Sequence, residues 1–113
     1  MIDPLARLIA IQEIKQLKAR YFRHMDMRDW DAMGQVFCQD VRFDCSEGFG
    51  TRGLDGVWTG EIAPVTVGRE PLMAWISSSF ATTTSAHHGH CHEIWIDNES
   101  EAHGICSMED WIL

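Results

Sequence analysis

The segment that decides the fold is Ala86-His87-His88-Gly89-His90-Cys91-His92-Glu93-Ile94, which holds four of the six histidines of the chain. Apolar and polar residues alternate around it, and this alternation predicts a β-strand over residues 83–96. Residues 97–100 (Asp-Asn-Glu-Ser) have the composition of a turn, and residues 101–113 alternate again. We therefore predict a β-hairpin over residues 83–113.

Upstream of this hairpin the sequence predicts mainly helices. An apolar residue recurs every three or four positions over residues 3–25, and the pair Asp3-Pro4 is a typical helix start. Asp29 is the expected cap of a second short helix over residues 30–37, and residues 69–80 favour a third helix. Residues 41–45 predict a strand. Five of the nine glycines lie between Gly48 and Gly60, so residues 46–68 leave room only for a short strand near Val57-Trp58.

This order predicts one domain over residues 1–113 in the α+β class. Helices gathered first and strands last favour helices packed on one face of a strongly bent antiparallel sheet. A sheet curled around a helix leaves a cone-shaped pocket, and pockets of this kind are apolar with a few polar groups.

The composition excludes several classes of partner. Nine basic and seventeen acidic residues give a net charge of −8, which argues against nucleic acid and against an anionic membrane surface. A highly anionic substrate is disfavoured as well, unless a local basic pocket overrules the global charge. We find neither a secretory leader nor a membrane span, and the wide spacing of the four cysteines does not match a zinc motif. We expect a cytoplasmic protein with free thiols.

The histidine run indicates proton chemistry, a metal site or a polar strand edge. Strict strand alternation places His88, His90 and His92 on one face, with His87 and Cys91 on the other. Imidazoles at positions i and i+2 of a flat strand diverge from one another. We therefore predict no metal site.

Two residues of the first predicted helix are candidates for chemistry. Tyr21 lies on the apolar stripe, so its hydroxyl is expected to point inward, and Asp26 follows five residues later. A buried carboxylate needs a partner, and a strand histidine would supply one as an acid–base dyad. The alternative is a solvated Asp26 and a core Tyr21. Asp110, on the return strand, is either a second pocket carboxylate or an exposed acid.

At this point the residues resemble a known family. Residues 14–23, followed by Asp26 and residues 28–31, are similar to the opening of SnoaL-like domains, which belong to the nuclear transport factor 2-like superfamily. Residues 86–94 and 102–110 are similar to its histidine-bearing hairpin. The resemblance is strongest to the branch of bile-acid dehydratase, with scytalone dehydratase and hexachlorocyclohexane dehydrochlorinase as more distant relatives.

The resemblance implies a cone-shaped α+β barrel that is dimeric or trimeric, has a deep apolar pocket and uses no cofactor. In the dehydratase-like members a His–Asp dyad removes a substrate proton while a tyrosine hydrogen-bonds the substrate. The base corresponds to His87, the orienting acid to Asp26, the phenol to Tyr21 and a further pocket carboxylate to Asp110. His88 stands where that branch has an apolar residue.

These expectations point to a cofactor-independent dehydratase-type lyase acting on a hydrophobic, cyclic or polycyclic substrate. An isomerase, a polyketide cyclase, or a non-catalytic small-molecule-binding or assembly module on the same fold stays open as an alternative. Family members continue into two further long strands, so we expect this chain to be C-terminally short, with an apolar sheet edge exposed.

Overall fold

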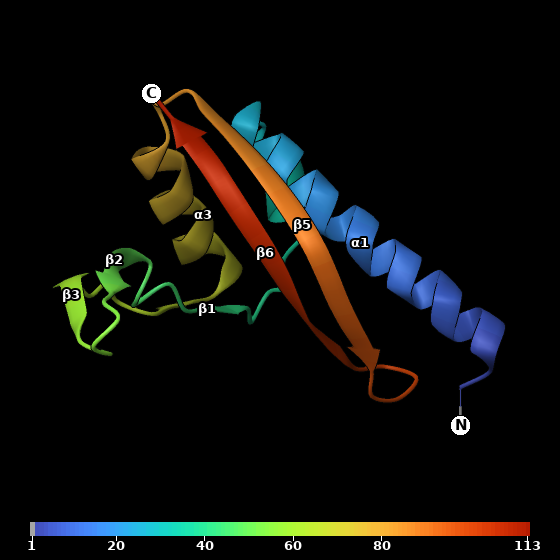
Figure 1. Cartoon of the computed structure of the whole chain (residues 1–113). Helices are drawn as coiled ribbons and strands as arrows, with labels where there is room; N and C mark the ends of the chain where they lie inside the picture. Colours follow the sequence, from blue (N-terminus) through green and yellow to red (C-terminus); the bar gives the residue numbers. More distant parts are fainter. Residues whose placement is uncertain (1) are drawn as a thin grey trace.

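The computed structural model describes residues 2–113 and shows a long helix lying along a β-hairpin (Figure 1). The elements in chain order are α1 (Pro4–Asp26), α2 (Trp30–Gly34), β1 (Arg42–Phe43), β2 (Phe49–Arg52), β3 (Trp58–Glu61), β4 (Thr66–Val67), α3 (Arg69–Ser79), β5 (Ser85–Ile96) and β6 (Ala102–Ile112). The three predicted helices and the predicted hairpin are confirmed, with boundaries that shift by one to three residues.

Helix α1 begins where the sequence places it. The carboxylate of Asp3 accepts hydrogen bonds from the backbone N–H groups of Leu5 (3.1 Å) and Ala6 (3.3 Å), and Pro4 occupies the first helical position. The apolar stripe is buried only toward the C-terminal end of the helix, because Leu5 and Leu8 are exposed. The C-terminal half of α1 is therefore the half that packs against the rest of the chain.

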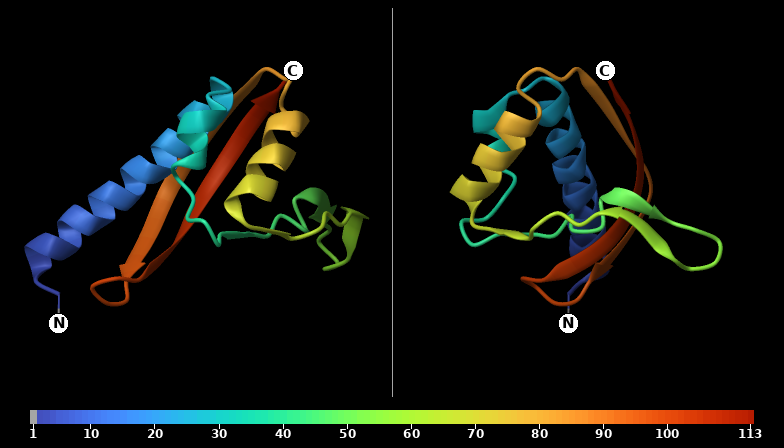
Figure 2. Two further views of the ribbon diagram at one scale, coloured as in Figure 1. Left: turned by 180° about the vertical axis from the view of Figure 1, so that it is seen from behind. Right: turned by 90° about the vertical axis from the view of Figure 1, so that its left-hand side faces the viewer.

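The hydrophobic core lies between the end of α1, α2 and α3. Its buried members are Met25, Met33, Leu72 and Ile76, and half-buried aromatic residues surround them. Asp29 caps α2 as expected, since its Oδ1 accepts the N–H of Ala32 at 3.2 Å. Helices α1 and α3 lie on the same side of the β5–β6 hairpin (Figure 2). This core fixes the end of α1 that carries Asp26.

The sheet differs from the expected cone. Within residues 2–113 the strands form three separate two-stranded antiparallel sheets, β1–β4, β2–β3 and β5–β6, and no sheet is closed or curled around α1. A sheet wraps around a helix only where several strands share one continuous ladder. Here β1 and β4 share only two residue pairs, and β2–β3 is a separate hairpin that projects from the body of the molecule (Figure 2).

The glycine-rich middle contains more strand than the sequence predicts. Gly50 of β2 and Gly60 of β3 stand directly opposite one another, and a Cβ on either would meet the backbone of the facing strand. These glycines allow the two strands to approach closely, so the prediction that residues 46–68 hold only one short strand was wrong.

A β-bulge interrupts β5 in the middle of the histidine run. His90 pairs with Ser107 and Glu93 with Ile105, so Cys91 and His92 together stand opposite Cys106. Cys91 has a φ of 52°, in the left-handed region. The extra residue changes the alternation of the strand, and His92 joins the face of His87 and Gly89. The predicted common face of His88, His90 and His92 is therefore wrong for His92.

None of the helices in residues 2–113 is both long enough and apolar enough to cross a membrane.

Candidate active site

Asp26 and His87 are joined side chain to side chain. The Oδ1 atom of Asp26, on the last residue of α1, lies 2.6 Å from Nδ1 of His87 on β5. His87 is only 8% exposed, so this contact is shielded from solvent. The expected contact between the helix-end carboxylate and a strand histidine is present, and it leaves the other ring nitrogen, Nε2, free of Asp26.

Two further hydrogen bonds fix the carboxylate of Asp26. The backbone N–H of His87 donates to Oδ2 at 2.9 Å, and the Ser85 hydroxyl donates to Oδ1 at 2.9 Å. Burial by itself would raise the pKa of Asp26, but the hydrogen bonds from His87 and Ser85 outweigh it and hold this pKa below its usual value of 3.8. Asp26 is therefore ionised at neutral pH and accepts the Nδ1–H proton of His87.

The lowered pKa of Asp26 predicts a pH-dependent contribution to stability. A carboxyl group whose pKa is lower in the folded chain stabilises the fold above its unfolded pKa, and this stabilisation is lost as the pH falls through the folded pKa. We expect the difference in free energy of unfolding between wild type and Asp26→Asn to be largest above about pH 5 and to shrink below about pH 4. Urea unfolding at a series of pH values measures this difference. The exposed Asp31→Asn variant is the control, and a wild-type to Asp26→Asn difference that stays constant from pH 6 to the acid limit would contradict the assignment.

Aromatic rings hold the imidazole of His87 in place. The ring of Phe22 stacks on it almost in parallel, with centroids 5.8 Å apart and an interplanar angle of 8°, and Phe80 approaches at 6.1 Å. Phe22 can take this position because the neighbouring strand residue is Gly89. A Cβ at Gly89 would lie 2.7 Å from Cε2 of Phe22. The ring orientation of His87 thus depends on packing as well as on Asp26.

Asp110 lies on the other side of His87. The two residues stand directly opposite in the β5–β6 ladder, and Oδ2 of Asp110 lies 3.7 Å from Nε2 of His87. This distance exceeds a hydrogen bond but suits an ion pair with a protonated imidazole. The Asp110 side chain is 42% exposed, so it can reach a bound molecule. The structure therefore places a carboxylate at each nitrogen of His87.

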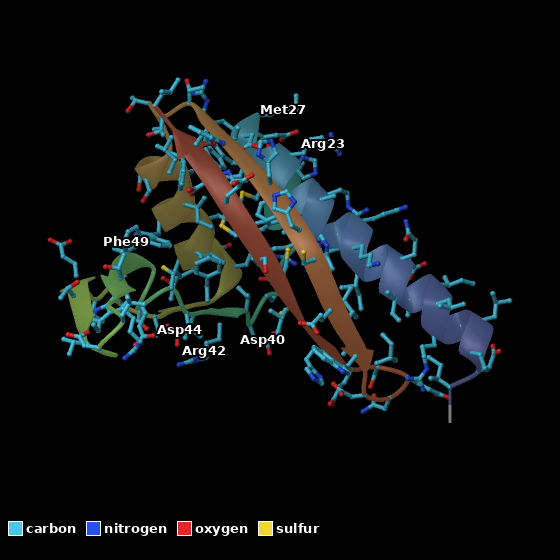
Figure 3. All side chains as sticks on the ribbon, viewed as in Figure 1. Arg23, Met27, Asp40, Arg42, Asp44 and Phe49 are labelled. Carbon is cyan, nitrogen blue, oxygen red and sulfur yellow. The ribbon has the colours of Figure 1, made fainter. Side chains whose placement is uncertain are left out.

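The four candidate residues do not line one cavity. Asp26 and His87 line a cavity of about 440 Å³ between α1 and β5, beside Arg23 and Met27 on the last turns of α1 (Figure 3). Asp110 lines a cavity of about 540 Å³ with α3 residues, and Tyr21 lines a third of about 250 Å³. Nε2 of His87 faces the carboxylate of Asp110, which lines the second of these cavities.

Tyr21 packs as a half-buried phenol. Its ring makes edge contacts with Phe22 and Phe37 at centroid distances of 5.4 and 5.9 Å. Burial raises the pKa of Tyr21 to about 12, and the nearby Cys45 adds to this shift. The phenol therefore keeps its proton at neutral pH and can act only as a neutral hydrogen-bonding group.

Sequence reasoning missed three residues that support this site. Ser85 holds Asp26, and Arg28 donates from its guanidinium to the carbonyl of Thr83 at 3.0 Å, so it ties the end of α1 to the segment before β5. Arg28 also ends α1 with a φ of 55°. The third is Lys18, whose Nζ lies 4.2 Å from the centroid of the Tyr21 ring. The spacing of Lys18 to Tyr21 and Phe22, at i+3 and i+4, was the available signal.

Two of the other histidines have carboxylate partners at the surface. Nε2 of His90 lies 3.3 Å from Glu109, and Nδ1 of His103 lies 2.9 Å from Asp97. Across residues 2–113 no group of three His, Cys, Asp or Glu side chains is placed to hold a metal ion.

Comparison with known proteins identifies the family. The family model described as the SnoaL-like domain matches residues 6–113. A comparison with curated proteins gives no match. The match spans α1, the hairpin and everything between them, including Asp26 and His87. The chain therefore belongs to the SnoaL-like domains of the nuclear transport factor 2-like superfamily, whose members bind or transform small molecules.

Proposed function

We propose that the chain is a cofactor-independent lyase of the dehydratase type that acts on a hydrophobic cyclic substrate. The observation that carries the proposal is the 2.6 Å contact between Nδ1 of the buried His87 and the ionised Asp26. This contact keeps the proton of neutral imidazole on Nδ1 and leaves a lone pair on Nε2, as a general base requires. The resemblance of the histidine hairpin to the bile-acid dehydratase branch supports this reaction over others.

In the proposed reaction His87 takes a proton from a carbon next to a carbonyl or a comparable activating group. The C–H electron pair becomes the new C=C bond, and the C–O bond of the neighbouring hydroxyl breaks. The proton from carbon passes to the departing hydroxyl, which leaves as water, so His87 returns to its neutral form. While Nε2 carries the proton, Asp26 and Asp110 stabilise the imidazolium from its two sides, at 2.6 and 3.7 Å.

The proposed reaction also gives a role to Asp110 and to Tyr21. Asp110 assists the leaving group, since its carboxylate is near Nε2 and lines the cavity next to Phe80 and Trp75. Tyr21 donates its phenolic hydrogen to a substrate oxygen. Its pKa of about 12 supports that role because the phenol stays protonated at the pH of the reaction.

The test is a screen for loss of water from cyclic β-hydroxyketones, followed by the absorbance of the conjugated enone. We expect wild type to convert at least one of them and Asp26→Asn to lose about 10²–10⁴-fold in kcat/KM. The asparagine amide can donate to Nδ1, which moves the imidazole proton to Nε2 and removes the base. Asp31→Asn is the matched control and should keep wild-type activity.

The competing function is binding without catalysis, and one observation favours it: Tyr21, His87 and Asp110 line three different cavities. Binding of hydroxyketones with no turnover in wild type would reject the lyase proposal. Equal turnover in wild type and Asp26→Asn would reject the Asp26–His87 dyad as its mechanism.

A further inference from the structure

Lys18 is a positive charge that faces the interior. It lies on α1 and is half-buried, and its Nζ is 4.2 Å from the ring centroid of Tyr21 and 4.9 Å from that of Phe22. Contacts of this kind attract a cation weakly but do not neutralise it. Burial lowers the pKa of Lys18, as expected for an ammonium group that has lost part of its hydration.

No carboxylate in residues 2–113 lies within 4.0 Å of Lys18. The Lys and Arg ion pairs there are Arg42 with Asp44 and Arg52 with Glu47, both at the surface. The chain carries seventeen acidic residues, so the absence of a partner at this position is a local arrangement and not a shortage of acids. A half-buried cation that contacts aromatic faces and has no carboxylate within 4.0 Å is placed to receive the anion of a ligand.

Lys18 also stands at the boundary of two cavities, together with Ile14. One, of about 250 Å³, is walled by apolar residues of α1 and of the segment that follows α2, namely Leu17, Val36, Phe37 and Phe43. The other, of about 270 Å³, lies against the hairpin between Ile94 and Ile105. Both offer apolar surface next to one charged group, as sites for amphipathic small molecules do.

The β-bulge brings a second polar group to this place. Because Cys91 is the extra residue, His92 turns to the α1 side of the hairpin and lines the second cavity with Lys18. Without the bulge, alternation would place His92 on the opposite face. An ammonium and an imidazole from two different elements therefore border the same space.

We propose that Lys18 anchors a binding site for a small monocarboxylate with an aromatic or alicyclic body, and that His92 supplies a second hydrogen bond to the carboxylate. Ile14, Ile94 and Ile105, which line the same cavity as Lys18 and His92, would contact the apolar body. One ammonium and one imidazole match a single carboxylate better than a phosphate dianion, which needs more donors. The site lies beside the Asp26–His87 cavity, which His92 also lines, and it does not require the chain to be a lyase.

The test is calorimetric titration with 2-naphthoate and with its neutral isostere 2-naphthamide. We expect the carboxylate to bind and the amide to bind about 10- to 100-fold more weakly, because a hydrogen bond to a charged group contributes about 1.5–3 kcal/mol. Lys18→Met keeps side-chain length and the contact with the rings, and it should weaken naphthoate binding by a similar factor. Arg20→Met removes a charge from the exposed side of the same helix and should leave binding unchanged.

Three results would overturn the proposal: equal binding of acid and amide by wild type, unchanged naphthoate affinity in Lys18→Met, or an equal loss in Arg20→Met. The first comparison uses wild type alone, so it holds even if Lys18→Met fails to fold. Titration of His87→Asn separates this proposal from the lyase function, because naphthoate binding should persist there when turnover is lost.

Discussion

His87→Asn is expected to lower kcat/KM for dehydration by about 10²–10⁴-fold, the usual contribution of a positioned general base. The asparagine amide N–H₂ can take the place of Nδ1–H as donor to Asp26, so the buried carboxylate keeps its partner. Nothing replaces Nε2, which is the only nitrogen of His87 that is free of Asp26. The loss should therefore appear in kcat, with a small change in KM.

The choice of asparagine follows from the packing around His87. His87 is 8% exposed and its ring lies against Phe22 and Phe80, so alanine would leave a cavity and would remove the imidazole donor from the Asp26 carboxylate. We expect His87→Ala to lower Tm more than His87→Asn does. The control is His88→Asn, the same substitution at the exposed neighbouring position. Wild-type turnover in His87→Asn would remove His87 from the reaction.

Gly89→Ala is expected to destabilise the fold at the candidate site by adding a single methyl group. The new Cβ would lie 2.7 Å from Cε2 of Phe22 and 3.1 Å from Sγ of Cys106. Phe22 is buried and stacked on His87, so its ring cannot move aside without disturbing the site. Overpacking of this kind costs about 1–3 kcal/mol, and in a domain of this size each kcal/mol lowers Tm by about 4–8 °C.

The matched control for Gly89→Ala is Gly34→Ala in α2. There the added Cβ would meet only Cγ of Met73, at 3.6 Å, which is an ordinary contact. Alanine in a helix is favoured over glycine by about 0.5–1 kcal/mol, so this variant should be neutral or more stable. Thermal unfolding measures both variants. A Gly89→Ala chain that melts with the wild type would mean that Phe22 does not pack on β5 as described.

Much of the fold could be predicted because its signals are local. The Asp3-Pro4 start, the apolar period of α1 and the turn at residues 97–100 each follow from neighbouring residues. A contact between Asp26 and a strand histidine could be anticipated as well, since a carboxylate at a buried helix end needs a donor, whereas the choice of His87 came from the resemblance to SnoaL-like domains. Their catalytic roles stay a prediction until the variants are measured.

The parts that could not be predicted depend on contacts between distant segments. The left-handed conformation of Cys91 has no local sequence signal, because a non-glycine residue rarely adopts it. In the sequence Lys18 resembles a surface lysine, and the structure shows that its ammonium group lies over the rings of Tyr21 and Phe22. The separation of the strands into three sheets depends on which edges meet in space, and alternation within one strand does not contain that information.

The bulge at Cys91 gives β5 two halves that are out of phase. Inward positions are odd-numbered before it, as at His87 and Gly89, and even-numbered after it, as at His92 and Ile94. When this strand is aligned with those of other proteins, a gap of one residue at the bulge does more than shorten the strand. It means that every side chain after the gap points to the opposite face of the strand. A protein that lacks the extra residue of the bulge could have the same residues in the rest of the strand and still present the opposite set of side chains to its first helix.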